Sequence, residues 1–198
     1  MPEISAQMVK DIRDATSASF IDCKKALEET SGNVDKAVEI LRVKGLAKAS
    51  KKAGRDTPEG VVTSYIHAGG KIGVLLEVNC ETDFVARNDE FQEFTKEVAM
   101  QIAAANPTYV SEADVPEDII NKEKEIMKAQ VIESGKPDNI ADKIVEGKIS
   151  KYFEENCLVN QIYIRNTKRK ISDLLSDLIA KVGENIKIRR FERFQLGE

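Results

Sequence analysis

The chain has 198 residues, of which 41% are hydrophobic and 32% are charged, a balance that is typical of a soluble globular protein. Its net charge of −4 argues against a general nucleic-acid binder, and no apolar run approaches the roughly 20 residues that span a bilayer. The chain starts without a basic region and apolar core, and its three distant cysteines, Cys23, Cys80 and Cys157, do not suit a disulfide framework. We therefore expect a cytoplasmic protein that binds neither nucleic acid directly nor a membrane.

Charge divides the chain into two parts. Residues 1–55 carry 11 Lys and Arg against 8 Asp and Glu, a net charge of +3, so the remainder carries −7. Such an asymmetry indicates two modules with different surfaces.

Three short helical patterns fill the first module. Ser5 can cap the first helix, and Ser19, three residues before Asp22, resembles a capping box with a shorter acid at the start of the second. A Ser-Gly-Asn break precedes the third helix, which Gly45 can end. We predict a small three-helix domain over residues 1–47. Its inward faces hold Met8, Val9, Ile12, Cys23, Ala26, Leu27, Val34, Ala37, Val38 and Leu41.

Residues 48–58 form a connector rich in charge. We predict a solvated linker, because runs of charge are usually solvated, and the alternative is a continuation of the third helix. From Val61 the apolar period changes to two, so residues 62–67 and 72–78 are predicted to be strands joined by a Gly-Gly hairpin turn. One face of the second strand carries only apolar residues and is expected to meet a core: Ile72, Val74, Leu76 and Val78.

A helix is predicted from Asn88, which can cap it, to Asn106-Pro107, which ends it. Its buried stripe holds Phe91, Phe94, Val98, Ile102 and Ala105. Residues 116–155 then read as two charged helices with narrow apolar seams, joined at residues 134–137. The seams hold Ile119, Ile120, Ile126 and Met127 in the first helix and Ile140, Ile144, Val145 and Tyr152 in the second. Such seams predict an antiparallel hairpin that projects outward, and the alternative is two ordinary helices lying on the domain.

A strong amphipathic helix and a strand close the chain. Before the helix lies a basic run without interleaved aromatics (Arg165, Lys168, Arg169 and Lys170), which favours a solvated helix start over an RNA contact. The helix stripe holds Ile171, Leu174, Leu175, Leu178, Ile179 and Val182, and Gly183 can cap its end. Residues 186–194 read as a strand that can pair with the earlier hairpin, so the second module is predicted to be α+β.

The sequence carries no complete catalytic or metal-binding motif. The nearest phosphate-loop candidate, residues 69–72, has Ile72 in place of the Mg²⁺-binding Ser or Thr and Tyr65 in place of the first glycine. His67 is the only histidine, which excludes a His–His zinc site within one chain, and Cys80 at the end of a buried strand suits packing better than nucleophilic catalysis. We predict no enzyme activity, metal or cofactor, and we interpret His67 as either a plain surface residue or a partner contact.

The most informative feature is a corner at residues 82–85, between the second strand and the next helix. Glu81 and Asp83 form a carboxylate pair, but no other polar groups converge on them as general acid–base catalysis would need. Pattern alone leaves two interpretations. Either Thr82 and Asp83 make a turn while Phe84 packs under the next helix, or the acid and the aromatic insert into a partner.

Two stretches resemble signatures of the translation elongation factor Ts family, in the family's order and spacing. They are Ile12 to Leu27 (IRDATSASFIDCKKAL) and Glu77 to Arg87 (EVNCETDFVAR). Residues 134–137 and 183–186 are also similar to the family, so the resemblance covers nearly the whole chain. One departure is Thr16-Ser17-Ala18-Ser19, where family members usually have Thr-Gly-Ala-Gly.

The resemblance implies a fold, an activity and a set of contact residues. The first domain would be a ubiquitin-associated-like (UBA-like) bundle, and residues 59–198 would form an α+β dimerisation-type core with a small antiparallel sheet and the helical hairpin. The activity would be guanine-nucleotide exchange on elongation factor Tu, without catalytic residues or a cofactor. The residues implied to disturb the partner's Mg²⁺ site are Thr82, Asp83, Phe84 and Val85. Further contacts implied by matching positions are Arg13, Phe20, Lys24 and His67.

The chain is similar to a short form of the family. Residues 65–74 resemble the second core half of longer members, whereas residues 77–87 resemble the signature of the first half. A homodimer could rebuild the missing half through the edge strands at residues 186–194 or 61–67. The competing hypotheses are a helical adaptor for ubiquitin-like partners, a ribosome- or RNA-associated structural protein, and an enzyme.

Overall fold

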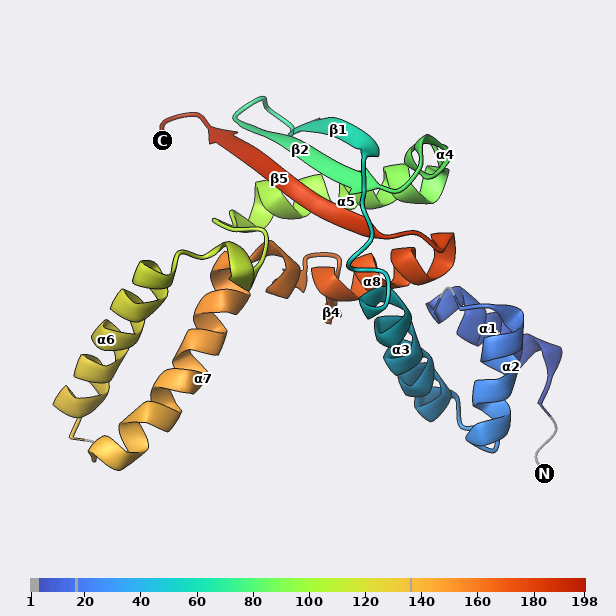
Figure 1. The fold of residues 1–198 in the computed structure, drawn as a ribbon, viewed down its shortest axis with the longest axis horizontal. Coiled ribbons are helices and arrows are strands. Elements are labelled where there is room, and N and C mark those ends of the chain that lie inside the picture. Colours follow the sequence, from blue (N-terminus) through green and yellow to red (C-terminus); the bar gives the residue numbers. More distant parts are fainter. Residues whose placement is uncertain (1–3, 17, 136) are drawn as a thin grey trace.

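The computed structural model describes residues 4–16, 18–135 and 137–198, and its fold is α+β, as predicted. Figure 1 shows a central body made of a sheet and its covering helices, from which two helical arms extend on the same side. One arm is the N-terminal bundle of α1 (Ala6–Thr16), α2 (Phe20–Glu29) and α3 (Val34–Ser50). The other arm is the pair α6 (Glu117–Glu133) and α7 (Asp138–Asn156).

The predicted caps of the bundle are confirmed. The Ser5 hydroxyl accepts a hydrogen bond from the Met8 N–H at 3.2 Å, and the Ser19 hydroxyl accepts one from the Asp22 N–H at 3.1 Å. Val34 was predicted to face the core but is 40% exposed, because it is the first residue of α3 and lies at the end of the bundle. Ser17 lies outside the described residues. The buried bundle core consists of Val9, Ile12, Cys23, Ala26, Leu27, Ala37 and Leu41.

The prediction that Gly45 ends the third helix is wrong, because α3 continues to Ser50. A glycine inside a helix costs about 1 kcal/mol relative to alanine, and packing of the last turns offsets this cost. Ala49 is buried in the core of the α+β body, and α3 packs against α8 (Ile171–Val182). Residues 48–50 of the predicted linker are therefore helical, and the predicted domain boundary at residue 47 falls inside α3 and stays a prediction.

The sheet is antiparallel, with the strand order β1 (Glu59–Ile66), β2 (Ile72–Cys80), β5 (Ile186–Gln195). This confirms that the last strand returns to the earlier hairpin. On the inward face of β2, Val74, Leu76 and Val78 are buried as predicted, Ile72 is only partly buried, and the buried face continues to Cys80. Strand β1 begins earlier than predicted, because Gly60 pairs with Asn79 and its φ of 149° suits glycine.

Two helices cover the inner face of the sheet. Helix α5 (Asp89–Ala105) packs on β1 and β2, and α8 packs on α5. The predicted caps are confirmed: the Asn88 side chain accepts from the Glu90 N–H at 2.8 Å, and Gly183 ends α8 in a left-handed conformation with φ 82°. The largest fully buried side chains of this core are Phe91, Leu76, Ile102, Leu158, Ile171 and Ile186.

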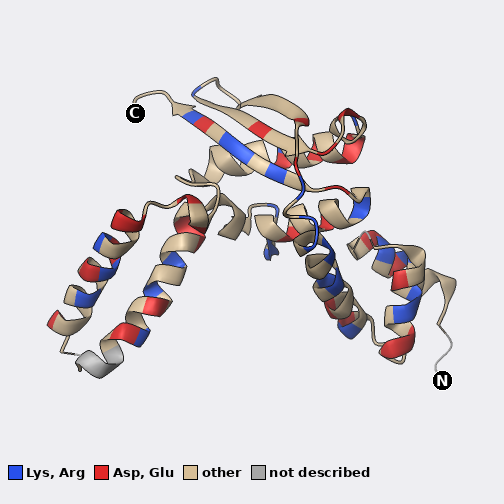
Figure 2. Ribbon diagram, in the orientation of Figure 1, with Lys and Arg blue, Asp and Glu red and all other residues tan. Residues whose placement is uncertain are grey.

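Helices α6 and α7 form the predicted antiparallel hairpin. Figure 1 shows the pair extending away from the sheet, which excludes the alternative of two helices lying on the domain. Acidic and basic residues are interspersed along both helices (Figure 2). Ile126 was predicted to lie in the seam but is 43% exposed, because it lies one position away from Met127 and so faces about 100° away from the seam. The side chain of Ile140 and all of Lys136 lie outside the described residues. The buried seam residues are Val131, Ala141, Val145 and Ile149.

The basic run leads directly into α8, and Arg165 and Lys168 are exposed, as expected for a solvated entry to the helix, but most of the run is a strand that the sequence did not predict. Residues of this run form β4 (Asn166–Lys170), which pairs with β3 (Ile162–Tyr163). Short 3-10 turns at Glu112–Asp114 and Leu158–Asn160 flank the hairpin. Three of its cations pair with acids from other elements: Arg165 with Glu97, Arg169 with Asp177 and Lys170 with Glu154.

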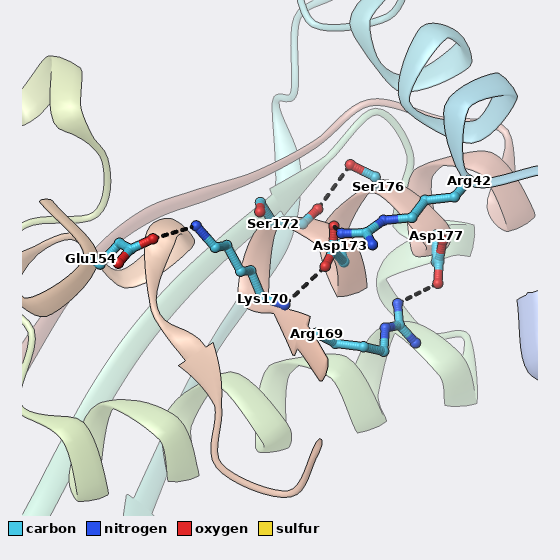
Figure 3. A network of polar contacts seen from close by, with 8 residues as sticks. All are labelled: Arg42, Glu154, Arg169, Lys170, Ser172, Asp173, Ser176 and Asp177. Atoms are coloured by element: carbon cyan, nitrogen blue, oxygen red, sulfur yellow. Dashed lines mark hydrogen bonds and ion pairs between the residues drawn. The ribbon is translucent and has the colours of Figure 1, made fainter. Parts of the chain in front are cut away.

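One polar network joins both arms to the body (Figure 3). Arg42 of α3 donates to Asp173 at 2.6 Å, and the other oxygen of Asp173 accepts from the Lys170 N–H at 2.9 Å. Lys170 in turn reaches Glu154 of α7 at 2.9 Å. Burial raises the pKa of Asp177, against the opposing effect of Arg169. The network adds an ion pair to the packing of α3 on α8.

Candidate functional site

The corner at residues 82–85 forms one helical turn, α4 (Asp83–Ala86), at the end of β2. Thr82 caps this turn, and its hydroxyl accepts from the Val85 N–H at 3.4 Å. Phe84 is 79% exposed, so the interpretation in which it packs under the next helix is wrong. The ring therefore contributes little to the core and is accessible to a partner.

Asp83 and Arg87 form an ion pair across this turn, and both side chains are exposed. Together with Phe84, Asn88, Asp89 and Glu90, they line a shallow hollow on the surface. The hollow therefore combines one apolar side chain with charges of both signs.

Val85 occupies the opposite environment to Phe84. It is 5% exposed and belongs to the core of the α+β body, as does its neighbour Ala86. The Cys80 thiol donates to the Thr82 carbonyl at 3.1 Å, and burial raises the pKa of Cys80 to about 11, so the thiol stays protonated at neutral pH. Val85 and Cys80 thus hold the base of the corner while Phe84 points outward.

The corner is also bound to the segment that follows α8. The Glu184 carboxylate accepts from the Thr82 N–H at 3.0 Å and from the Thr82 hydroxyl at 2.7 Å. In return, the Asn185 N–H donates to Glu81 at 2.6 Å. This N–H, with help from Arg55, holds the pKa of Glu81 below its ordinary value.

Residues of the first signature lie next to this region. Arg13 and Phe20 line a second hollow, whose far side is formed by Ala180 and Lys181 of α8. Lys181 pairs with Glu90 at 2.6 Å, and Glu90 also lines the hollow at Phe84. The two hollows therefore meet across one ion pair, and Figure 1 shows α4 on the same side of the body as the N-terminal bundle.

Lys24 and His67 take different positions. Lys24 lies on exposed α2, 3.9 Å from Glu28. His67 lies at the β1–β2 turn, where its Nδ1 is 3.0 Å from the Tyr65 hydroxyl. The nine-residue strand β2 separates this turn from the corner, a span of roughly 25 Å at about 3.3 Å per residue. The structure therefore does not bring His67 together with Phe84.

The sequence alone did not identify several residues of this region. Glu184 and Asn185 follow the predicted cap Gly183, but nothing in the local pattern links them to a corner about a hundred positions earlier. Arg87 could have been found, because it lies four residues after Asp83 and such pairs meet on a helix. Lys181 and Glu90 come together only through packing of α8 on α5.

The described residues give little support for a metal site, a membrane-spanning helix or a reactive cysteine. They contain no group of three or more His, Cys, Asp or Glu side chains placed to hold a metal ion. Among the helices that the structure describes, none has the length and apolar character needed to cross a membrane. Cys23, Cys80 and Cys157 are buried free thiols, and burial raises the pKa of each.

Comparison with known proteins gives one consistent family. A family model described as "Elongation factor TS" matches residues 2–198. A protein of Thermoanaerobacter sp. (strain X514) named "Elongation factor Ts" is 60% identical over 195 residues, which cover 98% of this chain and 96% of that protein. Proteins of the same name from Desulfosudis oleivorans and Thermotoga petrophila are 55% and 56% identical, and each alignment covers at least 98% of both chains.

Proposed function

The chain belongs to the elongation factor Ts family, and we propose that it is a guanine-nucleotide exchange factor for elongation factor Tu. In this proposal it binds the GDP-bound GTPase, disturbs the Mg²⁺ and phosphate site and so promotes GDP release. The observation that carries the proposal is the 79% exposure of Phe84 on a corner whose base is buried in the core. Residues 1–47 would act as a UBA-like domain that binds the partner separately.

Phe84 would insert into the partner beside its Mg²⁺ loop. A GTPase of this class holds GDP through its phosphate loop and through Mg²⁺, whose ligands lie on adjoining loops. An aromatic side chain buried at the centre of an interface can contribute about 2 kcal/mol or more. Each tenfold loss of GDP affinity requires about 1.4 kcal/mol of preference for the nucleotide-free state, so one such contact could weaken GDP binding more than tenfold.

The other residues of the corner would have supporting roles. Asp83, paired with Arg87, would compete for the hydrogen bonds that support the Mg²⁺ loop without itself binding the metal. Thr82 caps α4, and Val85 would anchor the inner side of this turn in the core. The partner would therefore meet a rigid corner, which lowers the entropy cost of binding.

The first domain would supply a second contact. Arg13 and Phe20 line the hollow that adjoins the corner through Lys181, so one partner surface could reach both. Lys24 is exposed on the same bundle. His67, at the other end of the sheet, would contact a separate region of the partner.

No chemical step is required of this chain. An exchange factor acts by binding the nucleotide-free state more tightly than the GDP-bound state. The coupling is reciprocal, because nucleotide rebinding weakens the hold of the factor as much as the factor weakens that of the nucleotide.

The test is the release of a fluorescent GDP from elongation factor Tu in a stopped-flow instrument. The full chain should accelerate release, and Phe84→Ala and Asp83→Ala should slow it while the fold persists. Full acceleration by both variants would refute the role of the corner, and no acceleration by the unmodified chain would refute the exchange function.

We also propose a homodimer, through the outer face of the sheet in place of the edge strands β1 and β5 that the sequence suggested. This face exposes Val62 and Ile66 of β1, Leu75 of β2, and Phe194 and Leu196 at the end of β5. Glu192 lies opposite Leu75 in the β2–β5 ladder, and Arg190, which pairs with Glu77 at 2.7 Å, lies two residues before it. A copy related by a two-fold axis could place opposite charges together. Light scattering of the chain and of Leu75→Asp, with and without elongation factor Tu, tests this: a monomeric unmodified chain would refute the dimer.

A further inference from the structure

The segment after α8 forms hydrogen bonds with the start of the corner through Glu184 and Asn185. Gly183 turns the chain in a left-handed conformation, which directs Glu184 toward Thr82. Both carboxylate oxygens of Glu184 are used, one by the Thr82 N–H at 3.0 Å and the other by the Thr82 hydroxyl at 2.7 Å. The contact joins residues that are 102 positions apart in the sequence.

A second contact runs in the opposite direction. The Glu81 carboxylate accepts from the Asn185 N–H at 2.6 Å, just beyond the pairing of Cys80 with Ile186 that ends the β2–β5 ladder. Each segment thus offers a side-chain carboxylate to the main chain of the other. The side chain of Asn185 is buried and donates to the Arg55 carbonyl at 2.8 Å, so the connector from the first domain joins the same set of contacts.

The corner needs such support because α4 is only four residues long. A single helical turn is not stable alone, since fixing its first dihedral angles is unfavourable. Val85 and Ala86 hold its inner side in the core, whereas its start at Thr82 is exposed and is held by Glu184. Phe84 follows two residues later, so its direction depends on where Thr82 is held.

We propose that Glu184 is a positioning residue for exchange, which acts through Thr82 to fix the direction of Phe84. The proposal rests on the proposed role of Phe84 in GDP release. It predicts that loss of the Glu184 carboxylate leaves the sheet and α8 in place but lets the corner adopt other orientations, few of which suit insertion.

A double-mutant cycle tests this dependence on Phe84. Glu184→Ala should lower the kcat/KM of GDP release about fivefold, the order of a pairwise coupling between neighbours, and it should have little further effect in a Phe84→Ala background. Glu184→Gln keeps an oxygen that can accept from the Thr82 N–H and should retain most of the activity. Glu146→Ala, on the exposed surface of α7, is the control and should match the unmodified chain.

A second measurement needs no partner. The chain has no tryptophan, so Phe84→Trp introduces a single indole at the corner. Time-resolved anisotropy should report a larger nanosecond motion of this indole when Glu184→Ala is added, and no change when Glu146→Ala is added. Thermal unfolding of each variant verifies that the fold is retained.

The outcomes separate the two proposals. Equal slowing by Glu184→Ala with Phe84 present and absent, or unchanged anisotropy, would overturn the positioning role. If Phe84→Ala leaves GDP release unchanged, the proposed role of Phe84 fails. Unchanged anisotropy would then show independently that Glu184 does not restrain the corner, which would overturn the positioning role. Slowing only when Phe84 is present, together with a more mobile indole, supports the positioning role.

Discussion

Phe84 and Val85 are neighbours in opposite environments, so their truncation to alanine should separate exchange from stability. Phe84 is 79% exposed and Val85 is 5% exposed. Full burial of a large apolar side chain contributes about 1.5–3 kcal/mol. The covered fifth of Phe84 therefore contributes only about 0.5 kcal/mol to folding, whereas the exposed part could contribute about 2 kcal/mol if the partner covers it.

Phe84→Ala should thus slow GDP release about 30-fold, since 1.4 kcal/mol corresponds to a factor of ten, and should barely change the urea midpoint. Val85→Ala removes two buried methyl groups and should lower the free energy of unfolding by about 1.5–3 kcal/mol. Its effect on release should be smaller than that of Phe84→Ala as long as the chain is folded. Stopped-flow release and urea unfolding on the same preparations measure both effects. A Phe84→Ala variant that unfolds easily yet exchanges normally would refute this reasoning.

Three further predictions concern the body of the protein. Arg42→Ala removes the 2.6 Å contact with Asp173, and it should increase proteolytic cleavage in the connector at residues 51–55. Gly60→Ala would place a Cβ 2.2 Å from the Val78 carbonyl oxygen, and it should lower the free energy of unfolding by more than about 2 kcal/mol in urea titrations. The lowered pKa of Glu81 implies stability that is fully present above the ordinary glutamate pKa of about 4.3 and is lost as the pH falls through the lowered folded value. Glu81→Gln should therefore show a smaller loss of stability on acidification, and an unchanged acid profile would contradict this assignment.

Helix caps and apolar periods predicted most of the fold. Ser5, Ser19, Asn88 and Gly183 act locally, so their roles can be inferred from a few neighbouring residues. The prediction at Gly45 was wrong because the tendency of a glycine to end a helix is weak compared with the packing of α3 on α8. Tertiary contacts that outweigh propensity are not visible in a local pattern.

The sequence located the corner, but it did not show whether Phe84 is exposed or which residues contact Thr82. Whether Phe84 is covered depends on how α5 packs, and an aromatic residue before a helix is compatible with both outcomes. The Glu184–Thr82 contact joins distant segments through sheet pairing, so no spacing rule could predict it. The acidic partners of the basic run before α8 were missed for the same reason, because they come from α5, α7 and α8.

The most direct test of the account is the affinity of the chain for two states of elongation factor Tu. Titration of the nucleotide-free and the GDP-bound forms gives the ratio of dissociation constants, which is the preference that drives exchange. We expect the nucleotide-free form to be bound more tightly, and we expect Phe84→Ala to reduce that ratio about 30-fold. Equal affinities for the two forms, or an unchanged ratio in Phe84→Ala, would contradict the account.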